Sequence, residues 1–120
     1  MLLDSNIFIY AALPEHAFLR PWFSKPGICA SNITRLEVLG YHQLSEIDKI
    51  DLNRLFQCVT IYPISSSIIE LAIHLRQQRK MSVGDSVIAA SALEYRQTLV
   101  TRNTDDFEWL EGLKVINPFE

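Results

Sequence analysis

The chain has 120 residues, of which 48% are hydrophobic and 21% charged, and its formal net charge is -3. A chain of this size and composition buries roughly two-thirds of its unfolded surface, so we predict one globular domain over residues 1–120 and exclude a disordered chain. No apolar run approaches the ~18 residues of a membrane span, and Met1-Leu2-Leu3 lacks the features of a signal peptide. The negative charge does not exclude a polyanionic substrate, because a bound cation can neutralise several carboxylates.

The two cysteines, Cys29 and Cys58, lie in apolar contexts. This placement predicts buried thiols rather than a disulfide framework. A reducing, cytoplasmic setting is therefore expected.

The first half of the chain alternates between predicted strands and helices. Residues 2–3 suit a short buried strand, and residues 7–10 begin a helix. A helical segment is expected over residues 14–23, with a break at Pro21 because proline disrupts helix hydrogen bonding. Residues 28–30 are expected to form a second strand that is followed by a helix capped by Ser31 or Asn32.

Further elements complete this half. The helix after residue 31 places Ile33, Leu36, Leu39 and Gly40 on one apolar face. A helix over residues 45–57 turns Ile47, Ile50, Leu52 and Leu55 inward. A strand over residues 59–62 stops at Pro63.

The second half continues the alternation. Helices are predicted over residues 66–80 and 85–95, and the small alanines of the second suit a helix packed on more than one side. Residues 99–101 and 114–116 are two more short strands. The whole pattern predicts an α/β fold, with a mostly parallel sheet of four or five short strands and helices on both faces. Ligands bind such sheets at the carboxyl ends of the strands.

Four short segments that contain acidic residues lie where apolar stretches of the sequence give way to loops or helix starts. They are Leu3-Asp4-Ser5-Asn6, Thr34-Arg35-Leu36-Glu37, Gly84-Asp85-Ser86 and the run from Thr101 to Phe107 that contains Asp105-Asp106. Gathered carboxylates repel one another unless a cation joins them. The four acidic segments therefore predict a divalent-metal site.

Two of these acids also have a structural explanation. Glu37 follows Thr34, and Asp85 follows Ser82, at the three-residue spacing of a helix capping box. Asp4 is harder to explain in this way, because an ionised group between Leu2-Leu3 and Ile7-Phe8 borders the core and needs partners.

The four acidic segments, in this order, resemble the motifs of PIN-domain ribonucleases. The match includes the opening Leu3 to Ile9, the glutamate Glu37, the helix from Asp85 to Leu93 and the turn from Thr101 to Phe107. The chain length and the Thr-Arg-Asn sequence most resemble the VapC-type toxins of bacterial toxin–antitoxin pairs. The resemblance implies a PIN-like domain over the whole chain.

The resemblance, together with phosphodiester chemistry, implies a role for each acid. Asp4, Asp85 and Asp106 are expected to be direct or water-bridged ligands of Mg²⁺ or Mn²⁺, which prefer oxygen donors. Glu37 is expected to be a ligand or to orient the attacking water, and Asp105 to point to solvent. The expected supporting residues are Ser5, Asn6, Thr101 and Asn103, and Arg102 is a candidate for phosphate contact.

The partners implied are an RNA substrate, a cognate antitoxin and a second copy of the chain in a homodimer. The aromatic residues Tyr10, Phe18, Trp22 and Phe23 suit core packing, and any left exposed suit a groove for an antitoxin segment. Two other functions remain open. One is a catalytically silent RNA-binding or scaffold module of the same fold, and the other is a phosphotransferase with Asp4 as its covalent nucleophile.

Overall fold

Five short strands form one sheet in the order β3-β2-β1-β4-β5, and every neighbouring pair is parallel. The strands are β1 (Leu2–Leu3), β2 (Cys29–Ser31), β3 (Thr60–Tyr62), β4 (Leu99–Val100) and β5 (Val115–Ile116). This computed structural model describes residues 1–120. The predicted parallel α/β sheet is confirmed, and its central strand is the first one of the chain.

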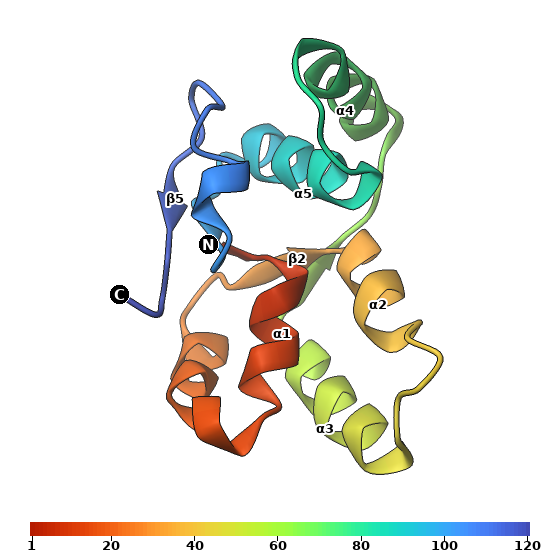
Figure 1. The fold of residues 1–120 in the computed structure, drawn as a ribbon, viewed down its shortest axis with the longest axis vertical. Helices are drawn as coiled ribbons and strands as arrows, with labels where there is room; N and C mark the ends of the chain where they lie inside the picture. Colours follow the sequence, from red (N-terminus) through yellow and green to blue (C-terminus); the bar gives the residue numbers. More distant parts are fainter.

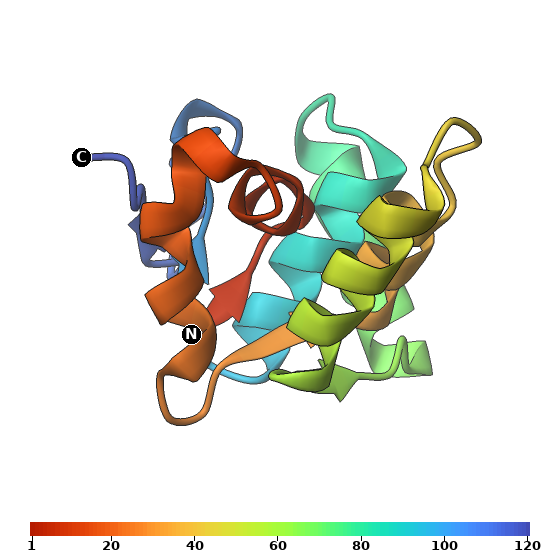
Figure 2. The ribbon, with the colours of Figure 1, turned by 90° about the horizontal axis from the view of Figure 1, so that it is seen from below.

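Helices cover both faces of the sheet (Figure 1). The helices are α1 (Ser5–Ala11), α2 (Asn32–Leu39), α3 (Glu46–Gln57), α4 (Ser66–Gln78) and α5 (Val83–Glu94), with two 3-10 segments, η1 (Pro14–Ser24) and η2 (Thr104–Asp106). Helices α4 and α5 lie on one side of the sheet, and α1, η1 and α3 lie on the other (Figures 1 and 2). None of these helices combines the length and apolarity that crossing a bilayer requires.

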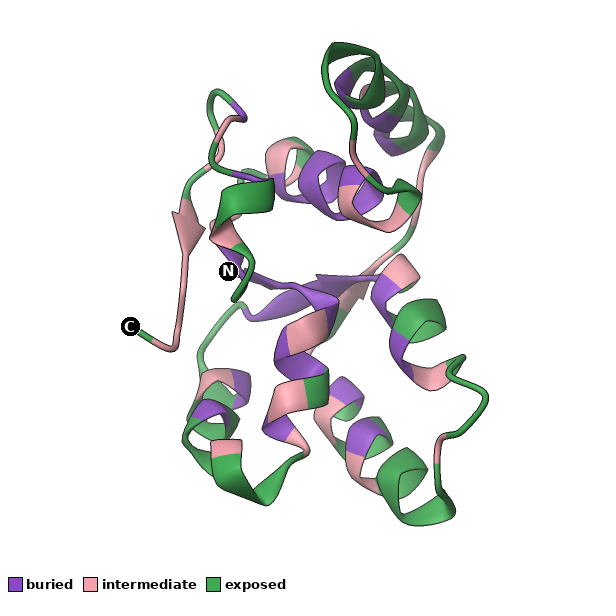
Figure 3. Ribbon diagram, viewed as in Figure 1, coloured by how far each residue is buried: buried purple, intermediate pink, exposed green.

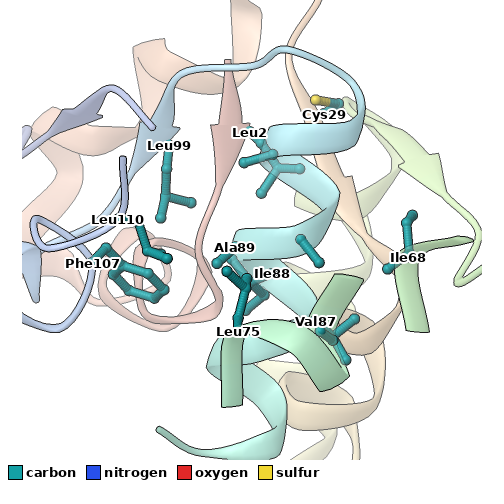
Figure 4. Packing of buried hydrophobic residues seen from close by; sticks show 13 residues of the cluster. Leu2, Cys29, Ile68, Leu75, Val87, Ile88, Ala89, Leu99, Phe107 and Leu110 are labelled. Atoms are coloured by element: carbon teal, nitrogen blue, oxygen red, sulfur yellow. The ribbon is translucent and has the colours of Figure 1, made fainter. Parts of the chain in front are cut away.

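Alternation along the strands divides the core into two clusters, because successive strand residues face opposite sides of a sheet. Leu2 and Leu99 belong to the cluster under α4 and α5, whereas Leu3 and Val100 belong to the cluster under α1, η1 and α3. Phe107, which follows η2, closes the edge of the first cluster beside Leu110 (Figure 4).

Helix α5 is buried along most of its length (Figure 3). All residues from Ser86 to Ala92 are buried. As predicted, its alanines allow close packing on more than one side. The helix begins two residues before the predicted start, because Ser82 caps it by accepting a hydrogen bond from the backbone N–H of Asp85. This places Gly84 and Asp85 in the first turn.

Two local predictions were wrong. The chain does not break at Pro21; the non-helical residue of η1 is His16, and Pro21 lies inside the segment. Short 3-10 turns lose one hydrogen bond at a proline without disrupting a long i→i-4 ladder. Cys29 is a buried thiol as predicted, but Cys58 is exposed, because it follows the last residue of α3 at the surface.

The predicted apolar faces of α2 and α3 were also wrong in part. Leu36 is 68% exposed and Ile47 is 72% exposed. Helix α2 instead buries Thr34 and Val38, and α3 buries Leu52, as predicted, together with Phe56. Both helices carry more apolar residues than one face can bury, so the periodicity alone did not indicate which face turns inward.

Candidate active site at the carboxyl edge of the sheet

The candidate site begins where the central strand ends. Asp4 directly follows β1, and Thr101 directly follows its neighbour β4. The two strands are parallel, with Leu3 opposite Val100, so the residues after them emerge side by side at the carboxyl edge. The backbone N–H of Asp4 continues the ladder by donating to the carbonyl oxygen of Val100 at 2.9 Å.

Asp4 is a buried carboxylate with two strong hydrogen bonds. The residue is only 5% exposed. Oδ1 accepts from the backbone N–H of Ser5 at 2.8 Å, which also caps α1, and Oδ2 accepts from the hydroxyl of Thr101 at 2.7 Å. These bonds favour the ionised form, but loss of hydration outweighs them and raises the pKa of Asp4 to about 6. The negative charges of Asp85 and Glu37 act in the same direction.

Thr101 organises the groups around Asp4. Its fully buried hydroxyl donates to Asp4 and accepts from the backbone N–H of Asn103 at 3.1 Å and from the amide of Asn6 at 3.4 Å. Asn103 therefore supports the site through its backbone. The other side of the Asn6 amide, Oδ1, is buried and has no hydrogen-bond partner. A buried acceptor without a donor is unusual and suits contact with water or a cation.

Glu37 enters the site from α2 rather than closing the end of that helix. Helix α2 starts at Asn32 and is capped by Ser31, so Glu37 lies beyond its first turn and the capping-box interpretation is wrong. Its Oε1 accepts from the hydroxyl of Ser5 at 2.7 Å. A β-carbon at Gly84 would lie only 2.9 Å from Cδ of Glu37. The carboxylate of Glu37 thus rests against the first turn of α5, in space that only a glycine leaves open.

Asp85 lies in that same first turn of α5. Partial burial raises the pKa of Asp85, the nearby charge of Asp106 raises it further, and the charge of Glu37 adds a smaller effect. The capping interpretation holds in part, since the hydroxyl of Ser82 accepts from the backbone N–H of Asp85. Asp85 is therefore both a helix-start carboxylate and a member of an acidic cluster.

Asp106 reaches the site from η2, at the far end of the sequence. It lines a cavity of about 510 Å³ together with Asp85, whereas Asp105 does not contribute to that cavity. Both Asp105 and Asp106 are exposed. Asp106, unlike Asp105, therefore shares a cavity with Asp85, and its role as the fourth acid stays a prediction.

The four acids, which we call the acidic site, form no ion pair with any lysine, arginine or histidine. The two ion pairs of the structure, Lys49–Glu46 and Arg54–Asp51, both lie within α3. The donors are all oxygen atoms, as Mg²⁺ and Mn²⁺ prefer, and the uncompensated negative charge would be relieved by such an ion. However, no three acidic, histidine or cysteine side chains converge closely enough to hold an ion in this arrangement. The donor chemistry thus fits a divalent cation, and binding would require side-chain movement.

Arg102 lies in a different environment from the one that its sequence position suggests. Its guanidinium stacks over two aromatic rings, 4.3 Å from the ring centroid of Phe119 and 4.9 Å from that of Tyr10. Its role as a phosphate contact stays a prediction. Tyr10 and Phe18 form part of the same aromatic cluster around Phe119, which supports packing more than a groove.

Sequence reasoning missed three contributors to the site. Thr34 is fully buried, and its hydroxyl lies 3.1 Å from that of Ser5. Gly84 makes room for Glu37, and Trp109 lines the cavity beside Asp106. The glycine directly before Asp85 was a visible signal, because glycine is unfavourable inside a helix and indicates close approach of another group.

Comparisons with known proteins agree with this architecture. A family model described as "PIN domain" matches residues 1–112. A toxin–antitoxin complex from Klebsiella pneumoniae is 31% identical, with a TM-score of 0.80 over 99% of this chain and 98% of that chain. No match was found among the curated proteins.

More distant structures share the fold. VapBC2 from Rickettsia felis, bound to a promoter DNA fragment, is 22% identical, with a TM-score of 0.81 over 97% of this chain and 96% of that one. VapBC-1 from nontypeable Haemophilus influenzae is also 22% identical, with a TM-score of 0.80 over 99% and 98%. The sheet, the order of the acidic motifs and the family match lead to one conclusion: the chain belongs to the PIN domain family.

Proposed function

We propose that this protein is a metal-dependent endoribonuclease and the toxin of a toxin–antitoxin pair. The observation that carries the proposal is the acidic site. Four acids from separate parts of the chain gather at the carboxyl edge of the sheet without forming an ion pair, and the pKa values of Asp4 and Asp85 are raised. Such a cluster costs stability, which favours a functional explanation over a structural one. The likeness to the Klebsiella complex supports the toxin assignment.

The residues of the site suit hydrolysis of a phosphodiester. Asp4, Asp85 and Asp106 would hold Mg²⁺ or Mn²⁺, which when bound supplies Lewis acidity and makes water a stronger nucleophile. Ser5 and Thr101 fix the orientations of Glu37 and Asp4 by hydrogen bonds of 2.7 Å. Glu37 is exposed and is held at its Oε1, and in this proposal it accepts a proton from the attacking water or orients it.

One observation favours the alternative of a catalytically silent module of the same fold. The acids do not converge on a common point in the present arrangement. The phosphotransferase hypothesis has less support, because both oxygens of Asp4 already accept hydrogen bonds, which weakens a nucleophile.

Cleavage of RNA by the purified protein separates these functions. A nuclease should cut single-stranded RNA internally when Mg²⁺ or Mn²⁺ is added and should stop when the metal is chelated. A silent module should bind RNA equally with and without metal and release no fragments. Absence of cleavage across a broad set of RNAs with both metals would refute the nuclease proposal.

The fourth carboxylate can be tested by thermal melts across a Mg²⁺ titration. An ion that binds only the folded protein stabilises it by about 2.7 kcal/mol at 100 times the dissociation constant. We expect Asp106→Asn to raise the melting temperature of the metal-free protein slightly, because it removes a charge that acts on Asp85, and to reduce the shift produced by Mg²⁺. Asp105→Asn is the matched control and should keep that shift. The reverse pattern would assign the fourth acid to Asp105.

A groove beside the acidic site suits the antitoxin. It encloses about 330 Å³ between α1, α2 and α3 and is lined mainly by apolar side chains. Ile9 and Tyr41 are exposed there, and Glu37 and Asp48 add negative charge. We propose that an antitoxin segment with apolar side chains and a positive charge binds this groove and reaches Glu37. The homodimer and a cytoplasmic location belong to the same proposal.

Growth measurements test the groove. Expression of the protein alone should arrest bacterial growth, and co-expression of its antitoxin should relieve the arrest. Ile9→Asp puts a charge in the groove, so relief should weaken while the arrest remains. Ile73→Asp changes an exposed isoleucine on α4, outside the groove, and should leave relief intact. Equal relief in both variants would argue against this groove as the antitoxin site.

A further inference from the structure

The cavity beside Asp85 and Asp106 also contains three cationic side chains. It encloses about 510 Å³ between the α4–α5 connection and the segment that follows η2. The cations are Arg76, Arg79 and Lys80. The cavity thus combines three cations with two acids of the acidic site. This distribution suits an extended ligand with several charges along its length rather than a ligand with a single charge.

The positive charge in this cavity is available to a ligand. Neither Arg79 nor Lys80 takes part in an ion pair, since both ion pairs of the structure lie within α3. Arg76 has a structural role, because its Nε donates to the carbonyl oxygen of Met81 at 3.1 Å and so braces the α4–α5 connection. Unpaired cations held beside such a braced turn are typical of phosphate contacts.

Trp109 adds an aromatic surface to the same cavity. Its indole Nε1 donates to the backbone oxygen of Asp106 at 3.0 Å, which fixes the ring, and one part of the side chain packs against the core. The guanidinium of Arg79 lies 5.4 Å from the ring centroid. A fixed aromatic ring next to unpaired cations is the arrangement that binds single-stranded nucleic acid, because bases stack on the ring while phosphates meet the cations.

We propose that this cavity is a nucleotide subsite for single-stranded RNA. Trp109 stacks on a base next to the scissile phosphodiester, and Arg79 and Lys80 contact the phosphates that flank it. This inference rests on the proposed nuclease function, since Asp85 and Asp106, which line the cavity, are two acids of the proposed catalytic site. An acidic peptide fits less well, because it would face the two carboxylates and offer no base to stack.

Tryptophan fluorescence tests the stacking directly. The chain has two tryptophans, so Trp22→Phe leaves Trp109 as the only one, and Asp4→Asn prevents cleavage during the measurement. A short single-stranded RNA of random sequence should quench the fluorescence of this double variant. An abasic strand of equal length should bind in a salt-dependent manner and quench far less. Equal quenching by both strands, or displacement of the RNA by poly-glutamate at equal charge, would overturn the proposal.

Affinity measurements separate the roles of the ring and the cations. Trp109→Leu should weaken RNA binding roughly 5- to 100-fold without changing its salt dependence, and Trp109→Phe should recover most of the loss. The slope of log affinity against log salt is negative. Arg79→Gln and Lys80→Gln should each make it less steep, by about 0.7. Lys49→Gln, on the surface of α3, is the control and should change neither quantity.

The outcomes for the subsite and for the nuclease proposal are distinct. If Trp109→Leu folds and cleaves with unchanged KM and unchanged affinity, the subsite is wrong while the nuclease function stands. If the native chain binds RNA with quenching but never cleaves it, the nuclease function is wrong while the binding subsite stands.

Discussion

Replacing Asp4 by asparagine should reduce RNA cleavage roughly 10²- to 10³-fold and, at neutral pH, should also raise the melting temperature of the metal-free protein. The loss of activity follows because the amide keeps the shape of the side chain but removes the charge that a cation needs. The gain in stability follows from burial, which makes the ionised form of Asp4 unfavourable in the folded state.

The stability effect has a defined pH dependence. The pKa of Asp4 is raised from 3.8 to about 6, so folding favours its protonated form. The resulting stabilisation is complete below about pH 4 and disappears as the pH rises through 6, where the ionised side chain costs about 3 kcal/mol relative to the neutral one. Asp4→Asn has no group to ionise there, so its advantage over the native protein should grow between these two pH values. The amide of asparagine accepts the hydrogen bond from the Thr101 hydroxyl less well than the carboxylate does, and this loss will reduce the gain in stability.

Thermal melts from pH 4 to pH 8 without metal, together with a cleavage assay, check this prediction. Asp51→Asn removes a carboxylate from the surface of α3 and serves as the control, because exposed ion pairs contribute little to stability. Native-like turnover by Asp4→Asn would remove Asp4 from the catalytic site. A melting-temperature difference that does not vary with pH would contradict the role of burial.

Gly84→Ala should reduce cleavage roughly 10- to 100-fold while leaving the protein as stable as before or more so. The new β-carbon collides with the carboxylate of Glu37, which is the end of a flexible side chain and can move away. That movement breaks the hydrogen bond from Ser5 and misplaces the carboxylate. Alanine also favours a helix over glycine by about 0.5–1 kcal/mol, so α5 itself should gain.

A double variant distinguishes a collision from a general disturbance. Glu37→Asp shortens the side chain by one methylene, so adding it to Gly84→Ala should restore part of the lost cleavage. Glu37→Gln combined with Gly84→Ala should be no worse than Glu37→Gln alone, because both changes disable the same group. Additive losses in that second pair would show that Gly84 acts independently of Glu37.

The parts of the site that lie at strand ends could be predicted from the sequence. Short apolar runs that stop at Asp4 and before Thr101 indicate parallel strands, and parallel strands bring their carboxyl ends to one edge. The partners of these residues could not be predicted in the same way. Glu37 reaches Ser5 only because α2 turns Thr34 and Val38 inward and leaves Leu36 outside, an orientation set by packing against α1 and α5.

The same limit explains the other errors. The apolar content of α3 exceeds its buried face, so Ile47 and Ile50 looked like core residues but lie at the surface. Apolar neighbours made Cys58 look buried, although the residue comes just after the end of a helix. Local composition describes a preference for burial, whereas the position of an element in the layers decides which residues are buried.

The hydrogen bond between Thr101 and Asp4 joins residues that are 97 positions apart. The central strand β1 emerges from the ribosome well before its neighbour β4 and the turn that carries Asp106. Contacts of such long range form late in folding. A nascent chain that lacks β4 and η2 therefore cannot assemble the acidic site, and any activity of this site arises only after both elements have been made.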